Sequence, residues 1–368
     1  MEKKRSRRAA ALVFSALPFV LIAAFYGLRQ NTGFANLVSQ KFSTPLRRGL
    51  GWLTSHVRFS VMEWVYAAVI LGVLAFLVLS VIHVVRAEKK GRVLVKRLAA
   101  LAVAAAYIWC GYCWLWGMDY YGTGFARKSG LESEGVTVAD LTRVTAYFAE
   151  EANRLSGQVP RDEEGHYLLD RNALFDRAAA VYDTAEKDFP VLEGENRRPK
   201  AMLFSRVMSY MGFTGIYFPF TGEANLNVDT PAALLPFTVA HELAHQRGIT
   251  AEQEANFCGI YACITSGDPE YMYSGYLGGL IYLSNALYSV DPAAYMVIME
   301  TFTDEVRTDI TDNNEYWASF ATGVTEVSEK IYDTYLKANG QETGIASYGQ
   351  CVDLLVECFR ERSISSLF

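Results

Sequence analysis

Three long apolar segments near the N-terminus restrict the folds that this chain can adopt. They span residues 9–28, 64–85 and 98–118, and none of them contains Asp, Glu, Lys or Arg. Each is roughly 20 residues long, and a helix rises about 1.5 Å per residue, so each can cross a hydrocarbon core of about 30 Å. The sequence therefore predicts three transmembrane helices and a membrane anchor over residues 1–118.

The basic residues that flank these segments predict their orientation. They gather at the N-terminus and in the loop between the second and third segments: Lys3, Lys4, Arg5, Arg7 and Arg8, then Arg86, Lys89, Lys90, Arg92, Lys96 and Arg97. Because such loops stay in the cytoplasm, we expect a cytoplasmic N-terminus and an extracytoplasmic domain from Asp119 onward. A cleaved signal peptide is the alternative for the first segment, but its long apolar run and the two segments that follow favour a retained helix.

The loop between the first two segments combines aromatic residues and leucines with basic residues over residues 34–59. This composition suits a short amphipathic segment in the membrane interface. It suits a solvated loop equally well, so both interpretations stay open at this point.

Residues 119–368 are numerous enough to form one domain with its own core. Apolar residues recur every three or four positions over residues 136–155 and 171–189, which predicts amphipathic helices. Residues 215–222 are aromatic and β-branched and form the best strand candidate, with residues 203–208 and 224–228 as flanking strands. From Pro231 onward the pattern is again helical, so we expect a mostly α fold of the α+β type with a small β-sheet or hairpin.

Two of the five histidines stand four residues apart in the sequence H-E-L-A-H, as His241 and His245 around Glu242. On a helix, residues i and i+4 lie on one face, so both imidazoles point to one spot. The H-E-x-x-H pattern provides two zinc ligands and a carboxylate that accepts a proton from water. The alternative is a helix whose histidines only form hydrogen bonds in a core, but a buried Glu242 without a metal would be costly to satisfy.

Signals at both ends of this segment delimit the expected helix. Asp229 or Thr230 suits its N-cap, and Pro231 or Pro236 suits its first turn. Gly248 suits its C-terminal end.

A catalytic zinc usually has three protein ligands and one open position, so a third ligand is required. The other histidines lie in or near the apolar segments or in a polar turn, which favours a carboxylate. A second helix that begins near Thr250 carries Glu252 and Glu254, which lie about 200° apart around its axis. Asn256 shares the face of Glu252 and can support a ligand there, so we favour Glu252 and retain Glu254 as the alternative.

The segment HELAHQRG, followed closely by E-x-E-A-N, resembles the gluzincin class of zinc metallopeptidases. The E-x-x-A-D or E-x-x-A-N pattern of integral-membrane and anti-repressor-cleaving zincins, carried over by position, implies Glu252 as the third zinc ligand and Asn256 as its support. The chain departs from the membrane peptidases in having asparagine rather than aspartate at position 256, and in the short link between the two helices.

Four further stretches resemble a bacterial membrane family known only as a domain of unknown function. They are LWGMDYY after the third apolar segment, LFSRVMSYMGFTGIYFPFTGEANLN, PFTVAHELAHQRG and KANGQETGIASYGQCVDLL. The resemblance covers nearly the whole chain and implies a multi-pass protein of the bacterial plasma membrane, without an established substrate.

Together these features predict a membrane-anchored zinc metallopeptidase with a helical, zincin-like outer domain. Zn²⁺ lowers the pKa of bound water from about 15.7 toward about 7, Glu242 takes the proton, and Tyr348 is a candidate donor to the oxyanion. We expect a lipid bilayer and a peptide or protein substrate as partners, and no nucleic acid; the sequence does not indicate the oligomeric state. The alternative is a membrane-anchored zinc-binding or interaction module that cleaves no bond.

Overall fold

The computed structural model describes residues 2–131, 135–195, 197–339, 341 and 348–365. The chain forms two compact units. The first contains Met1–Thr54, Val61–Gly122 and Pro219–Gly222, and the second contains Ser55–Ser60, Thr123–Phe218 and Glu223–Phe368. Most described residues are helical and one small sheet is present, which confirms the predicted fold class.

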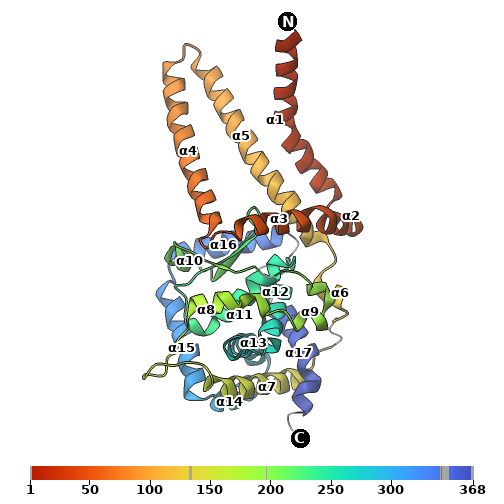
Figure 1. The fold of residues 1–368 in the computed structure, drawn as a ribbon, viewed down its shortest axis with the longest axis vertical. Coiled ribbons are helices and arrows are strands. Elements are labelled where there is room, and N and C mark those ends of the chain that lie inside the picture. The colour runs from red at the N-terminus through yellow and green to blue at the C-terminus, as the bar shows by residue number, and fades with distance from the viewer. Residues whose placement is uncertain (1, 132–134, 196, 340, 342–347, 366–368) are drawn as a thin grey trace. The chain divides into compact units, whose positions relative to one another are not determined.

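Three long helices of the first unit match the predicted apolar segments. They are α1 (Glu2–Leu28), α4 (Val61–Arg86) and α5 (Lys90–Leu115), and each contains a stretch long and apolar enough to cross a membrane (Figure 1). The third ends at Leu115, earlier than predicted, and the 3-10 turn η2 (Gly117–Tyr121) follows. Buried Arg47 stabilises this end, because its guanidinium donates to the Leu115 carbonyl and lies 2.5 Å from Asp119 Oδ2.

The segment between the first two long helices is itself helical. It consists of α2 (Thr32–Val38), the π-helical turn η1 (Ser39–Ser43) and α3 (Thr44–Thr54). On α3, Leu46, Trp52 and Leu53 are exposed, whereas Arg47 is buried. Exposed apolar side chains on a short helix favour a place in the membrane interface over a solvated loop.

The second unit contains most of the helices. They are α6 (Phe125–Ser129), α7 (Val138–Ser156), α8 (Arg171–Arg177), α9 (Ala185–Asp188), α10 (Ser205–Tyr210), α11 (Leu235–Gln246), α12 (Glu252–Thr265), α13 (Pro269–Val290), α14 (Pro292–Glu300), α15 (Asp304–Ser319), α16 (Gly323–Ala338) and α17 (Tyr348–Ser365). The short 3-10 turns η3 (Ala178–Ala180), η4 (Pro190–Leu192) and η5 (Ala232–Leu234) connect some of them.

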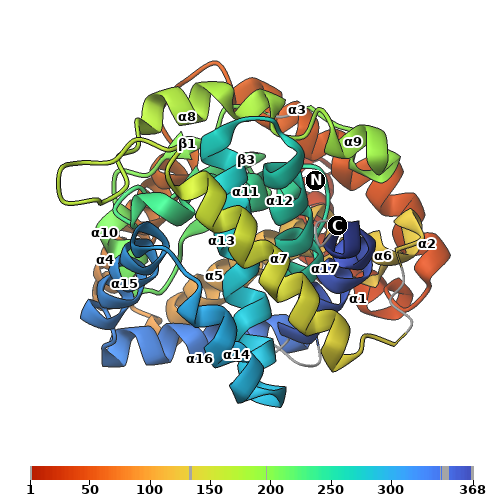
Figure 2. The same ribbon diagram turned by 90° about the horizontal axis from the view of Figure 1, so that it is seen from below.

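Helix α13 forms the centre of this unit, where it packs against α7, α11, α12 and α17 (Figure 2). Two glycines permit its close approach to its neighbours. A Cβ atom at Gly275 would lie 2.5 Å from the Cβ of Cys263 on α12, and one at Gly279 would lie 2.4 Å from the ring of Phe148 on α7. Side chains at these positions would force the helices apart, so this core depends on glycine.

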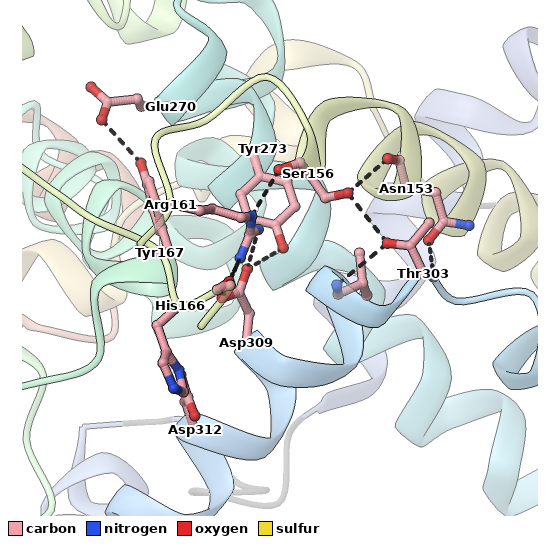
Figure 3. A network of polar contacts seen from close by, with 12 residues as sticks. Asn153, Ser156, Arg161, His166, Tyr167, Glu270, Tyr273, Thr303, Asp309 and Asp312 are labelled. Atoms are coloured by element: carbon pink, nitrogen blue, oxygen red, sulfur yellow. Dashed lines mark hydrogen bonds and ion pairs between the residues drawn. The ribbon is translucent and has the colours of Figure 1, made fainter. Parts of the chain in front are cut away.

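A buried ion pair joins the loop after α7 to α15 (Figure 3). Arg161 donates to both carboxylate oxygens of Asp309, at 3.1 and 2.7 Å, and the Tyr273 hydroxyl donates to the same carboxylate. The side chain of Asp309 is 1% exposed. Its charge is therefore balanced by Arg161, and its oxygens are satisfied by hydrogen bonds from two elements.

The sheet has three short strands in the order β1-β3-β2. They are β1 (Lys200–Ala201), β2 (Gly215–Phe218) and β3 (Glu223–Leu226); β1 runs parallel and β2 antiparallel to β3. The predicted strands at 215–222 and 224–228 are found in shortened form. The predicted strand at 203–208 is wrong, because α10 occupies this segment, and its apolar residues recur every three or four positions rather than every two.

Candidate metal centre

Helix α11, which carries the H-E-x-x-H motif, begins with Pro236 in its first turn and is followed by Gly248 at φ +98°, as predicted. The predicted N-cap at Asp229 or Thr230 is wrong, because η5 intervenes and Leu234 occupies the N-cap position without a side-chain hydrogen bond. A first-turn donor is satisfied from another helix instead, since the Phe237 N–H donates to Ser274 Oγ of α13 at 3.0 Å.

Helix α12 begins at Glu252, and Ala251 rather than the predicted Thr250 occupies its N-cap position. The Gln253 side chain, expected to complete a capping box there, accepts a hydrogen bond from the Cys351 N–H of α17 at 3.2 Å. Packing against α17 therefore replaces the local cap at the start of this helix.

The two helices bring His241, His245 and Glu252 together. The Nε2 atoms of His241 and His245 lie 3.3 and 3.6 Å from Glu252 Oε2 and Oε1 respectively, and one ligand atom of each residue lies within 4.8 Å of the others. Ligands that bind Zn²⁺ tetrahedrally at about 2.0–2.2 Å are separated by roughly 3.3–3.6 Å. The spacing of these donor atoms therefore fits a metal of that size.

A second hydrogen bond orients His245 for this role. Its Nδ1 atom lies 2.6 Å from the Ile249 carbonyl oxygen, and since a carbonyl only accepts, Nδ1 carries the proton. Nε2 is then left as the lone-pair donor that faces Glu252. Ligand histidines typically have this arrangement, in which a backbone carbonyl fixes the ring and its tautomer.

The charges of the three residues compensate one another. Burial alone would raise the pKa of Glu252, but His245 and His241 hold it well below its usual range. Burial alone would lower the pKa of His245, yet the Glu252 carboxylate raises it to about 9. The pocket therefore stabilises one positive charge beside the Glu252 carboxylate, as a cation site requires.

Glu242, between the two histidines, is 4% exposed and does not belong to the ligand group. The Tyr217 backbone N–H of β2 donates a hydrogen bond to its carboxylate. Its Oε2 atom has no hydrogen-bond partner among the described residues. Burial raises the pKa of Glu242, although His241 and His245 oppose this shift. A buried carboxylate with one free oxygen and a raised pKa is suited to proton transfer.

Strand β2 runs directly against this carboxylate. A Cβ atom at Gly215 would lie 2.5 Å from Glu242 Oε1, so the absence of a side chain at this position is what allows the approach. Within the described sheet, β2 pairs only with β3 and is an edge strand. The Tyr217 N–H bond to Glu242 places the free edge of β2 beside the candidate base.

Tyr332 of α16 also belongs to this site, and the sequence did not identify it. Its hydroxyl forms a hydrogen bond with the Glu252 carboxylate, and burial together with that carboxylate raises the phenol pKa well above its ordinary value. Its ring packs edge-on against Phe213, with centroids 5.3 Å apart. Nothing in the local sequence distinguishes it from the other tyrosines among the 22 in the chain.

The remaining predicted site residues lie elsewhere. The Glu254 carboxylate accepts hydrogen bonds from the backbone N–H groups of Phe125 and Ala126, at 2.7 and 3.0 Å, and so is directed to the start of α6. Asn256 is half-buried, with no hydrogen-bond partner within the part of the chain that the structure describes. Tyr348 is the first residue of α17, and its side chain lies outside the described residues.

Comparison with known proteins gives one match. The model of a family described as "Protein of unknown function (DUF3810)" matches residues 38–356. No curated protein matches the chain, and no solved structure matches it. The matched region covers most of the chain and contains α11, α12 and α16, which carry every residue of the site.

Proposed function

We propose that this chain, which belongs to the DUF3810 family of proteins of unknown function, is a membrane-anchored zinc metallopeptidase. One observation carries the proposal. Beside three side chains whose donor atoms have the spacing of a zinc site lies a fourth, Glu242, which is buried, acidic and not a ligand, with one unpartnered oxygen. A site that only binds metal has no use for this carboxylate, whereas hydrolysis requires a base at this place.

His241, His245 and Glu252 would hold Zn²⁺, which when bound lowers the pKa of a water molecule and polarises a carbonyl group. Glu242 accepts the proton of that water and delivers it to the leaving amine, and its raised pKa suits both steps. The Tyr217 N–H holds one end of the carboxylate. Tyr332 fixes the orientation of Glu252 through its hydroxyl and is therefore a positioning residue.

The edge strand supports a peptide or protein as the substrate. An extended peptide can add to a free strand edge through main-chain hydrogen bonds, and the free edge of β2 passes beside Glu242. Gly215 leaves no side chain between the strand and the carboxylate. A peptide aligned along β2 would therefore bring its backbone carbonyl groups close to the base.

The alternative is a membrane-anchored module in which zinc or packing stabilises the second unit and no bond is cleaved. Structural zinc sites usually close with four protein ligands, and the described residues provide three. The proposal also includes the location: a bacterial plasma membrane, a cytoplasmic N-terminus and an extracytoplasmic second unit, with the three apolar helices as the anchor.

The test uses full-length protein in detergent, loaded with zinc and incubated with a mixture of unstructured peptides. Products are identified by mass spectrometry for the wild type and for Glu242→Gln. We expect cleavage by the wild type and a loss of at least about 100-fold in the variant, with unchanged zinc content. Equal cleavage by both proteins would contradict the role of Glu242, and the absence of cleavage by zinc-loaded wild type would favour the non-catalytic module.

A further inference from the structure

Helix α16 exposes its most apolar side chains. Val324, Val327 and Ile331 are spaced three and four residues apart and are 57%, 58% and 66% exposed. The opposite side, which is less exposed, carries Thr325 and Tyr332 instead. A helix on the surface of a soluble domain normally has the reverse arrangement, with its apolar stripe toward the core.

The segment around α10 is arranged in the same way. Leu203, Phe204 and Val207 are 78%, 57% and 52% exposed, whereas Ser205 and Ser209 are buried. Two helices of one unit therefore direct apolar side chains outward and hydroxyl groups inward. Such a pattern indicates that something other than water covers the outer side.

The two helices are neighbours (Figure 1). Thr325 Oγ1 of α16 donates to the Tyr210 carbonyl at the end of α10 at 3.2 Å, and the ring of Phe213 packs against that of Tyr332. These contacts bring the two apolar stripes together. We call the combined surface the α10–α16 face; it consists of Leu203, Phe204, Val207, Tyr210, Met211, Val324, Val327 and Ile331.

The chain itself places this face near a candidate membrane helix. The ammonium group of Lys200, which is buried, donates to the Val57 carbonyl in the segment Ser55–Ser60. Val57 precedes the first residue of α4, Val61, by four residues, and Leu203 follows Lys200 by three. At no more than about 3.6 Å per residue, these connections span at most roughly 14 and 11 Å. The start of the face is therefore held close to the point where the chain enters α4.

We propose that the α10–α16 face lies on the lipid bilayer, with its apolar side chains among the headgroups and upper acyl chains. Amphipathic helices bind in this way, with the apolar side buried about 5–10 Å deep. The aromatic rings of Phe204 and Tyr210 suit the interfacial region. Since α4 and its neighbours are the anchor, the bilayer is always present at high effective concentration. This inference does not depend on zinc binding or on catalysis.

A second exposed apolar cluster in the same unit provides an internal control. It consists of Tyr288, Val290, Met296 and Val297 at the junction of α13 and α14, with exposed fractions of 57%, 56%, 46% and 66%. No contact of the kind that Lys200 makes with Val57 links this cluster to a segment next to an apolar helix. Its exposure matches that of the α10–α16 face, so its labelling by a lipid probe measures the background.

The experiment reconstitutes the full-length protein at one copy per nanodisc, in phosphatidylcholine that carries a photoreactive diazirine high on one acyl chain. Labelled peptides are identified by mass spectrometry. We expect residues 203–211 and 324–331 to be labelled together with the three apolar helices, several-fold above the α13–α14 cluster. The double variant Val327→Ser/Ile331→Ser should lower labelling of the face, whereas Val297→Ser, the matched control, should not.

Labelling of the face at or below the level of the α13–α14 cluster would overturn the proposal. Labelling that is lost when two copies share a disc would also overturn it, because the face would then bind a second copy of the chain. Zinc content is measured on the same samples. A labelled face on a protein that binds no zinc would refute the metallopeptidase proposal alone, so the two failures are distinguishable.

Discussion

Replacing Gly215 by alanine tests whether β2 and Glu242 approach each other as closely as the structure shows. The added Cβ would lie 2.5, 2.7 and 2.9 Å from Oε1, Cγ and Cδ of Glu242. Since carbon atoms normally remain about 3.5 Å or more from such neighbours, the carboxylate has to move by about 1 Å. The Glu242 side chain is flexible enough to give way, so we expect the fold to survive and the base to be misplaced.

A misplacement of about 1 Å typically costs about 100-fold in rate, which corresponds to about 2.7 kcal/mol of transition-state stabilisation. We therefore expect Gly215→Ala to lower kcat/KM for peptide hydrolysis by about 100-fold, with unchanged zinc content and circular dichroism. Gly157→Ala is the matched control, because an added Cβ there meets no atom within 4 Å at a φ of −83°. Full activity in Gly215→Ala would refute the reasoning, and so would a loss of zinc, since the contacts of the new methyl group involve Glu242 and no ligand.

Three further predictions concern the surroundings of the site and the core of the second unit. Tyr332→Phe removes the hydroxyl that orients the glutamate ligand, so zinc affinity should fall about 10- to 100-fold in a chelator competition; unchanged affinity would contradict that role. Asp309→Ala leaves a buried guanidinium without its partner and should cost about 3–5 kcal/mol in denaturant unfolding, whereas Asp333→Ala, at a more exposed pair, should cost less than about 1 kcal/mol; equal effects would count against the buried network. Hydrogen bonding and charge from Asp312 raise the pKa of His166 above its ordinary value, so this pair stabilises the fold below that ordinary value and the effect is lost as pH rises through the raised one. The difference in stability between wild type and Asp312→Asn should therefore shrink between about pH 5 and pH 9, and a constant or growing difference would refute this reading.

Features that depend on local spacing could be predicted from the sequence. An apolar run of sufficient length has few outcomes other than a spanning helix, and α1, α4 and α5 follow the three runs. The i, i+4 spacing of His241 and His245 fixes their shared face wherever the helix lies. Glu252 was preferred to Glu254 from the geometry of a single helix, and the structure brings Glu252 to the two histidines.

Features that depend on distant parts of the chain could not be predicted. Tyr332 reaches Glu252 only because α16 folds back against the site. The edge position of β2 depends on which strand pairs with β3, and its own residues do not specify this. The expected caps of α11 and α12 are replaced by contacts from α13 and α17. Local polar signals at helix ends were overridden by tertiary packing in both cases.

Zinc content tests the central claim most directly. Elemental analysis of full-length protein, purified after zinc loading and dialysis, is compared for the wild type, Glu242→Gln, His245→Ala, Glu252→Gln and Glu254→Gln, the last of which alters the other acid of the same helix. The account predicts about one zinc per chain in the wild type, Glu242→Gln and Glu254→Gln, and a clear loss in His245→Ala and Glu252→Gln. Absence of zinc from the wild type, or equal zinc in all five proteins, would contradict a metal centre formed by His241, His245 and Glu252.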